Sequence, residues 1–343
     1  MLGTNLKTAV QFAKKATFLK CYVEIQDDLQ ALEKNLSDFL KTETKTAVEV
    51  STHIFAQGGK RVRPALYFMS CRALGYKGPH YHRMAVVPEY IHAASLLHDD
   101  VIDDSTLRRG KPAARKIWGD ESSVLTGDLI YARASELMAQ TGNLQIVEGF
   151  ARTIRKMSEG ELIQLENIFN SDVSKFTYLK IIEYKTALLL AQSCQAAAFL
   201  ANRLDLSQQF FNFGLNIGLA YQIIDDAIDM SQSGLNTGKK AFADLNEGKF
   251  TLPLILLRDK LSAADWEELT GVFLSETKSI LVMQNASKNI TAKVFEHNCI
   301  SETFHEAQTY TDRALAALLD LEQRGLNVQL LRECSKMLLD RTA

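Results

Sequence analysis

The chain has 343 residues, of which 46% are hydrophobic and 23% are charged, and this composition predicts a sizeable folded core and excludes a disordered chain. Lys plus Arg number 39 and Asp plus Glu number 41, so the formal net charge is -2, which argues against nucleic acid as a partner and requires any anion site to be local. Five scattered cysteines without a close pair argue against a disulfide framework or a zinc site and favour a reducing compartment.

The first 23 residues contain four lysines and no acidic residue. Import signals share this charge pattern, but they also tend to be rich in arginine and serine, which this stretch lacks. We therefore predict a surface helix here and a cytoplasmic protein, with a mitochondrial location as the alternative.

The spacing of apolar residues predicts helices throughout. With five prolines and 18 glycines, the chain has too few turn signals for a sandwich or a barrel, and no segment is a convincing strand. We predict an all-α, single-domain bundle over residues 1–343, with a motif-bearing core at about 50–255 and C-terminal helices at 256–343. The expected helices cover 24–55, a segment opened by Pro64, 86–104, 121–141, 145–169, 174–202 and 207–231, followed by a loop up to Gly248 and two to four weaker helices.

Two apolar segments lie within these helices. The longest uncharged run, Leu206–Ile224, is long enough to span a bilayer but is interrupted by six polar residues. The segment 186–202 is rich in alanine and leucine. We expect both to be buried helices of the bundle and no transmembrane segment.

Four aspartates gather at the end of the helix predicted at 86–104. Asp99 and Asp103 are one turn apart on the same face, and Asp100 and Asp104 follow them. Carboxylates at a helix C-terminus oppose the helix dipole and repel one another, so the cluster costs stability unless a cation binds. The alternative is a solvated acidic helix end.

A second acidic cluster decides between these interpretations. Asp225, Asp226 and Asp229 repeat the DDxxD spacing directly after a long apolar helix. Two such helix ends facing each other would form a cage of oxygen ligands, which favours Mg²⁺ with open positions for substrate phosphates. No His or Cys is spaced for zinc, and we expect His98 to have a packing role.

Basic residues accompany both acidic clusters. Each group alone is typical of a solvated surface, but together they predict two diphosphate sites, one bridged by metal and one held by Lys and Arg. The groups are Lys60, Arg61 and Arg63 beside Gly58 and Gly59, then Arg108, Arg109 and Lys111, then Lys185 with Thr186, then Lys239 with Lys240, and finally Lys249.

Four segments together resemble the trans-type isoprenyl diphosphate synthases, or polyprenyl synthetases. They are QGGKRVRP, IHAASLLHDDVIDDSTLRRG, YKTALLL and YQIIDDAIDMSQSGLNTGKKAFADLNEGKFTLP, in the family's order. The resemblance implies a helical bundle around a central cavity, usually dimeric. It also implies an enzyme that joins isopentenyl diphosphate to an allylic diphosphate with Mg²⁺, three ions in all and with Mn²⁺ as a substitute.

The resemblance assigns roles to individual residues. It places Asp99, Asp103 and Asp225 nearest the metals, with Asp100, Asp226 and Asp229 in support. Its residues for the allylic diphosphate correspond to Arg108, Lys185, Gln222 and Lys239, and those for isopentenyl diphosphate to Lys60, Arg63, His92 and Arg109. Thr186 and Lys249 lie in the same motifs with less defined roles. Of these residues, Asp99, Asp103, Asp225, Arg108, Lys185 and Lys239 are the predicted catalytic set.

Product length is expected to depend on the residues one turn before Asp99. These are Ala94 and Ser95, whose small side chains would leave a tunnel open and give a long product of hexaprenyl to decaprenyl length, suited to a quinone side chain. Tight helix packing is the alternative explanation for two small residues. Phe150 and Leu162 are the candidates for a deeper floor.

Three other functions stay open. A farnesyl or geranylgeranyl diphosphate synthase would make a shorter chain, and a class I terpene cyclase would have no use for the second diphosphate pocket. A non-catalytic partner subunit would be expected to lack some of these Asp or Lys residues. We expect a homodimer, although heteromeric complexes occur among long-chain members, and peripheral association with a membrane would assist release of a greasy product.

Overall fold

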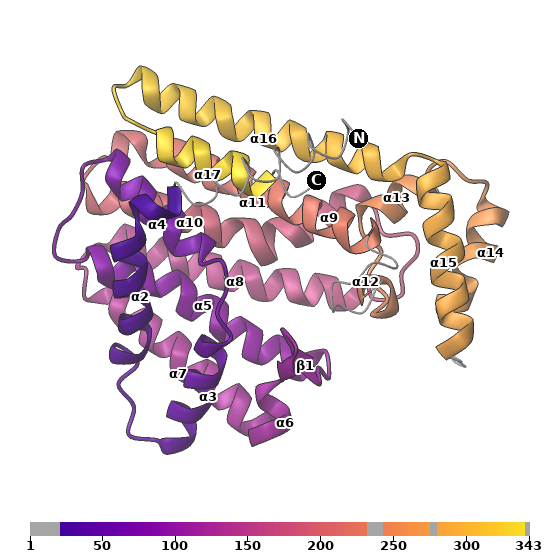
Figure 1. The fold of residues 1–343 in the computed structure, drawn as a ribbon, viewed down its shortest axis with the longest axis horizontal. Coiled ribbons are helices and arrows are strands. Elements are labelled where there is room, and N and C mark those ends of the chain that lie inside the picture. Colours follow the sequence, from indigo (N-terminus) through magenta and orange to yellow (C-terminus); the bar gives the residue numbers. More distant parts are fainter. Residues whose placement is uncertain (1–20, 232–242, 275–279, 340–343) are drawn as a thin grey trace, which may run out of the picture. The chain divides into compact units, whose positions relative to one another are not determined.

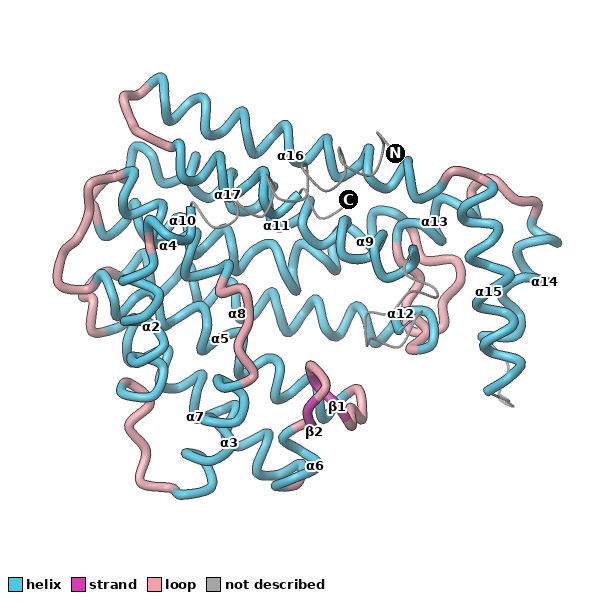
Figure 2. Tube along the Cα trace, in the orientation of Figure 1, coloured by secondary structure: helices cyan, strands magenta, loops and turns pink. Residues whose placement is uncertain are grey.

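The structure is a computed structural model that describes residues 21–231, 243–274 and 280–339 (Figure 1). Almost all described elements are helices, which confirms the all-α prediction (Figure 2). The chain divides into two compact units, of which the first comprises 1–154, 189–214 and 317–334 and the second 155–188, 215–316 and 335–343. The single domain over residues 1–343 stays a prediction.

Unit 1 contains the N-terminal helices and a small hairpin. These elements are α2 (Gln26–Asp38), α3 (Lys45–Ala56), α4 (Val62–Ala73), α5 (Tyr81–Ile102), β1 (Leu107–Arg108), β2 (Lys111–Pro112), α6 (Ala114–Trp118) and α7 (Asp120–Ala139). Five helices contribute residues to both units. They are α8 (Leu144–Glu166), α10 (Leu188–Leu200), α11 (Leu204–Ser231), α16 (Cys299–Gln323) and α17 (Gln329–Leu339).

Unit 2 contains the remaining elements. They are α9 (Lys175–Ile182), the π-helical segment η1 (Glu183–Ala187), α12 (Ala243–Asn246), α13 (Leu252–Arg258), α14 (Ala263–Leu274) and α15 (Ile280–Glu296). Its core is a cluster of apolar side chains from α9, α11 and α13 to α16, including Ile182, Ile223 and Leu254.

Helix α5 is the centre of unit 1 and packs extensively against α7. Apolar residues occupy most of its circumference, as expected of a helix surrounded by others. Aromatic rings join its neighbours, since the ring centroids of Phe68 and Tyr81 are 5.1 Å apart and Phe55 stacks on Tyr90 at 5.6 Å. The rigid position of α5 fixes the aspartates at its C-terminal end.

The structure corrects several predicted boundaries. The helix expected over 24–55 is two helices, because the chain turns between Asp38 and Lys45, where Lys41 has a positive φ of 43°. The loop after α5 contains an antiparallel hairpin in which Leu107 pairs with Pro112 and Arg108 with Lys111 (Figure 2), although no strand was predicted. At least five helices follow Gly248 in the described chain, against the two to four expected.

All five cysteines are buried thiols, as expected for a chain without a disulfide framework. None of the helices in the described ranges combines the length and the apolar character needed to cross a membrane.

Candidate active site

The first aspartate motif lies at the end of α5. Asp99 and Asp100 belong to the last helical turn and Asp103 caps it, since its backbone N–H donates to the Asp99 carbonyl at 2.8 Å. Asp100 is 1% exposed and accepts hydrogen bonds from Nε of Arg108 at 2.9 Å, with the Nη2 of Arg108 at 2.7 Å. Asp99 is half-buried and Asp103 is exposed. The hairpin that follows α5 therefore brings the side chain of Arg108 back to the aspartate motif.

The basic residues predicted to hold isopentenyl diphosphate also gather in unit 1. Arg109 at the hairpin turn donates to the Gly58 carbonyl, and a Cβ added to Gly59 would lie only 2.9 Å from Nη1 of Arg109. Arg63 and Arg109 lie near enough to His92 for their charges, after burial, to lower its pKa well below the usual value. His92 is thus a neutral imidazole beside a concentration of positive charge.

Arg61 holds this basic segment in place. Its guanidinium donates to Glu33 of α2 at 2.7 Å and to Glu89 of α5 at 2.9 Å, and its side chain is 11% exposed. The Tyr22 hydroxyl donates to the Lys60 carbonyl at 2.6 Å. Because Arg61 is committed to these carboxylates, the segment is fixed by the fold before any ligand binds.

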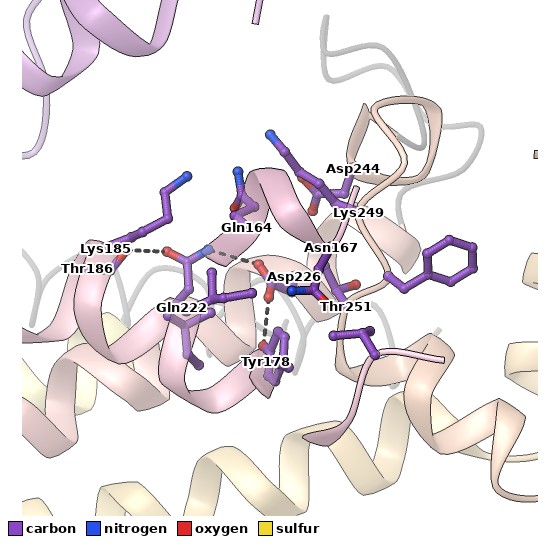
Figure 3. Close-up of a pocket in the computed structure, with 14 residues that line it drawn as sticks. Gln164, Asn167, Tyr178, Lys185, Thr186, Gln222, Asp226, Asp244, Lys249 and Thr251 are labelled. Carbon is purple, nitrogen blue, oxygen red and sulfur yellow. Dashed lines mark hydrogen bonds between the residues drawn. The ribbon is translucent and has the colours of Figure 1, made fainter. Parts of the chain in front are cut away.

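The second aspartate motif lies in unit 2, where its member Asp226 lines a pocket of about 220 Å³ (Figure 3). The lining residues include the predicted Lys185, Thr186, Gln222, Asp226 and Lys249. The others are Gln164, Asn167, Val173, Tyr178, Ile181, Ile182, Asp244, Phe250 and Thr251. The lining combines apolar side chains with amides, carboxylates and two lysines, so the pocket suits a ligand with a charged head.

A chain of hydrogen bonds links three helical segments across this pocket (Figure 3). The Thr186 hydroxyl donates to Oε1 of Gln222 at 3.0 Å, and Nε2 of Gln222 donates to Oδ1 of Asp226 at 2.8 Å. The Tyr178 hydroxyl donates to Oδ2 of Asp226 at 2.7 Å. Asp226 is 5% exposed, and its burial together with the charges of Asp244 and Asp225 raises its pKa well above the usual value.

Glycines allow the helices of this pocket to approach closely. A Cβ on Gly218 of α11 would lie 2.6 Å from Cα of Ala187, and one on Gly160 of α8 would lie 2.7 Å from Cβ of Tyr184. Gln222 follows Gly218 by one turn and therefore reaches Thr186. Glu161 follows Gly160 and forms an ion pair with Lys185.

The loop after α12 brings Lys249 to the pocket. Lys249 N–H donates to the Asp244 carbonyl at 2.8 Å, and Phe169 N–H donates to the Gly248 carbonyl at 2.8 Å. Gly248 has a φ of +77°, and an added Cβ would lie 2.5 Å from the Phe169 ring. Only glycine meets both requirements at this position.

A model of the polyprenyl synthetase family matches residues 44–290, which are most of the chain. The chain belongs to the polyprenyl synthetase family.

Individual members of the family support the predicted type. Solanesyl-diphosphate synthase 2, chloroplastic, of Oryza sativa subsp. japonica is 35% identical over 259 residues, which are 74% of this chain but only 64% of the rice protein. Heptaprenyl diphosphate synthase component 2 of Geobacillus stearothermophilus is 34% identical over 309 residues, 89% of this chain and 94% of that protein. The crystal structure of a decaprenyl diphosphate synthase from Rhodobacter capsulatus matches with a TM-score of 0.86 at 30% identity, covering 95% of this chain and 99% of the other. These relatives are long-chain polyprenyl diphosphate synthases, in agreement with the predicted resemblance.

Members of the family generally use Mg²⁺, and the acidic residues present here fit such an ion. The candidate ligands are carboxylate oxygens, as Mg²⁺ prefers. Asp225 and Asp244 lie close enough to Asp226 for their charges to raise its pKa. Within 21–231, 243–274 and 280–339, no three His, Cys, Asp or Glu side chains already converge as metal ligands.

The predicted residues of the product tunnel differ in their surroundings. Ala94 is fully buried, and Ser95 is half-buried with its hydroxyl donating to the His92 carbonyl at 2.9 Å. Phe150 is fully buried, and Leu162 is 59% exposed. The tunnel assignment of these residues stays a prediction.

Some predictions concern residues outside the pocket or outside the described chain. His98 has the expected packing role, since its ring covers Gly127 of α7 and its Nε2 lies 3.1 Å from the Val124 carbonyl. Lys239 lies outside the described residues. Asp229 lies near α12, with the Asp244 N–H 3.5 Å from its Oδ2.

Among the residues that the sequence analysis did not name, Tyr178, Glu161 and Asp244 interact with predicted members of the site. Glu161 and Asp244 are ordinary acidic residues in the sequence: Glu161 meets Lys185 beside the close contact of Gly160, and α12 brings Asp244 to the pocket. For Tyr178 a signal existed, because it lies seven residues before Lys185 and two helical turns place such residues on one face.

Proposed function

We propose that this protein is a Mg²⁺-dependent prenyltransferase that extends an allylic diphosphate with isopentenyl diphosphate to a long all-trans polyprenyl diphosphate. The observation that carries the proposal is the pocket of unit 2, in which Thr186, Gln222 and Asp226 are joined by hydrogen bonds beside Lys185 and Lys249. A lining that combines carboxylates and lysines with apolar side chains fits a diphosphate with a hydrocarbon chain.

Different residues of the chain have different roles in the reaction. Lys185, Gln222 and Thr186 hold the allylic diphosphate as its carbon–oxygen bond breaks, and Arg108 and Lys239 are assigned the same task. Mg²⁺, when bound at the aspartates, neutralises the negative charge that develops on the leaving diphosphate. Fixed donors are effective here because they need no reorganisation at the moment of bond breaking.

The second substrate is assigned to the basic residues of unit 1. Lys60, Arg63 and Arg109 bind the diphosphate of isopentenyl diphosphate, and the neutral His92 offers a hydrogen bond without adding charge. The double bond of isopentenyl diphosphate then attacks the allylic carbon, and the proton that is lost passes to the departing diphosphate. Holding the two reactants in line replaces a rare bimolecular encounter.

We further propose three Mg²⁺ ions, replaceable by Mn²⁺, a homodimer, and a cytoplasmic enzyme that releases its product near a membrane. The buried thiols support a reducing compartment. The ion count and the dimer rest on the family resemblance alone. The chain made by this enzyme would suit the side chain of a quinone.

The test is an incubation of the purified chain with labelled isopentenyl diphosphate, farnesyl diphosphate and Mg²⁺, with an EDTA control, followed by chromatography of the dephosphorylated products. We expect a metal-dependent ladder that ends beyond geranylgeranyl. A ladder that stops at or before geranylgeranyl would contradict the long product. An absence of all elongation would contradict an enzyme that acts alone and favour a partner subunit.

A further inference from the structure

The Tyr178 hydroxyl makes a hydrogen bond for which the proposed reaction has no direct use. Tyr178 is in the second turn of the helical stretch that begins at Lys175, is 3% exposed, and donates to Oδ2 of Asp226 at 2.7 Å. A carboxylate only accepts hydrogen bonds, so the hydroxyl is the donor in this contact. Figure 3 shows the Tyr178 hydroxyl and the Gln222 amide reaching Asp226 from different directions, each at its own carboxylate oxygen.

The two donors together fix the orientation of the Asp226 carboxylate. Gln222 occupies one lone pair of Oδ1 and Tyr178 one lone pair of Oδ2, so the carboxylate cannot rotate about its terminal bond without losing one of them. Each oxygen keeps a second lone pair. Without Tyr178, the carboxylate would be held from one side only.

The same fixation extends to the residues predicted to hold the diphosphate. Asp226 accepts from the amide nitrogen of Gln222, which leaves Oε1 of Gln222 to accept from Thr186. If the Asp226 carboxylate rotated, it would lose the hydrogen bond from Gln222. The freed Gln222 side chain would then lose the hydrogen bond from Thr186. Tyr178 therefore stands at the start of a line of contacts that ends at the predicted diphosphate-binding residues.

We propose that Tyr178 is a positioning residue, which orients the Asp226 carboxylate and through it Gln222 and Thr186 for binding of a metal-bound diphosphate. In this role it acts through Asp226, to which its hydroxyl donates. The inference rests on the proposed function, because that function supplies the diphosphate. Residues that orient the ligands of a metal typically change metal affinity 10- to 100-fold when they are replaced.

The variant that tests this is Tyr178→Phe, and the chain offers a matched control in Tyr81→Phe. Tyr81 is also 3% exposed and also donates to a buried carboxylate, Asp28, at 3.0 Å, but it belongs to unit 1, whereas the lining residues of the pocket belong to unit 2. Both variants lose one buried hydrogen bond of the same type. A structural role alone would therefore affect both proteins in the same way.

The measurement is isothermal titration calorimetry of the full chain with Mg²⁺ and inorganic diphosphate, together with the melting temperature. We expect Tyr178→Phe to weaken this binding about 10-fold or more and Tyr81→Phe to leave it unchanged, while both lower the melting temperature. Equal binding by Tyr178→Phe and the wild-type protein would overturn the proposal. An equal loss in Tyr81→Phe would overturn it too, because the effect would then be one of general stability.

A double variant adds a second test. If Tyr178 acts through Asp226, adding Tyr178→Phe to Asp226→Asn should change the affinity for Mg²⁺ and diphosphate less than about twofold, whereas independent effects would multiply. Multiplied effects would refute the proposal, and this comparison stays available should Tyr178→Phe alone fail to fold. Calorimetry needs no turnover, so failure of the elongation assay would reject the proposed function separately from the role of Tyr178.

Discussion

The two aspartate motifs bury the same member, the second aspartate of each. Asp100 is 1% and Asp226 5% exposed, whereas the preceding aspartates are only half-buried. The partners differ, however. The Asp100 carboxylate pairs with the guanidinium of Arg108, whereas Asp226 accepts from the neutral donors Tyr178 and Gln222, and its burial together with the charges of Asp244 and Asp225 raises its pKa. A bound cation would favour the charged form of Asp226, so we expect the second motif to gain stability from one.

The Arg108–Asp100 pair predicts a large effect on stability. Replacing Arg108 by Gln leaves a buried carboxylate without its counter-ion, which costs about 3 kcal/mol for a pair of this kind. We expect urea denaturation to show this loss in the free energy of unfolding. The double variant Arg108→Gln/Asp100→Asn should recover most of it, and purely additive losses would contradict the pairing.

Ala94 predicts an effect on the product. The Ala94→Phe variant places a ring in the fully buried space one turn before Asp99, so a growing chain in that space should stop earlier. We expect a shorter product ladder from the same assay, with turnover retained. Ser95→Ala, which keeps the space open, serves as the control. An unchanged ladder in Ala94→Phe would show that the chain grows elsewhere.

Among the elements, η1 has the largest consequence for the pocket. The π-helical turn Glu183–Ala187 interrupts a continuous helical stretch at the point where Lys185 and Thr186 face the pocket. Such single π turns inside helices are rare and occur mostly at functional sites. The close contact of Gly218 with Ala187 lies in the same turn.

The glycine contact predicts that Gly218→Ala destabilises the protein. The added Cβ meets the backbone of Ala187, which cannot move aside as a flexible side chain would, and overpacking of this kind costs about 1–3 kcal/mol. The control is Gly271→Ala in α14, where nothing lies within 4 Å of the added Cβ. It should be neutral or stabilising by up to about 1 kcal/mol. Denaturant unfolding measures both, and equal values would contradict the proposed contact.

The sequence was informative where one local pattern determines one element. The apolar spacing located α5, α7, α8 and α11 within a few residues, and the charge clusters located both aspartate motifs. It was not informative about η1, because the residues from Ile182 to Leu188 contain no proline or glycine to mark the irregular turn. The pairing of Glu161 with Lys185 was equally hidden, since it depends on a contact between segments distant in the chain.

For the whole molecule, each unit carries one aspartate motif and its own basic residues. Unit 1 holds Asp99 to Asp104 with Arg63 and Arg109, and unit 2 holds Asp225 to Asp229 with Lys185. Each unit therefore contributes its own set of charged residues to the proposed chemistry.

Ligand binding should consequently stabilise the molecule. A ligand that binds only the folded state adds about 2.7 kcal/mol at a concentration 100 times its Kd. We expect the melting temperature to rise with Mg²⁺ and inorganic diphosphate together, and to fall back on addition of EDTA. The variant Asp225→Ala should reduce the rise, and a full rise in that variant would argue against the aspartate motif of unit 2 as part of the binding site.

The π turn also makes the site sensitive to the length of a helix. A helix turns by about 100° per residue, so removal of one residue between Ile182 and Thr186 would restore a regular helix and rotate everything before it relative to Thr186. Tyr178 would then face away from Asp226, although no residue of the pocket had been replaced. The one extra residue of η1 thus sets the rotation of α9 relative to Thr186. We therefore expect a single deletion within the turn to disturb the site far more than substitutions around it.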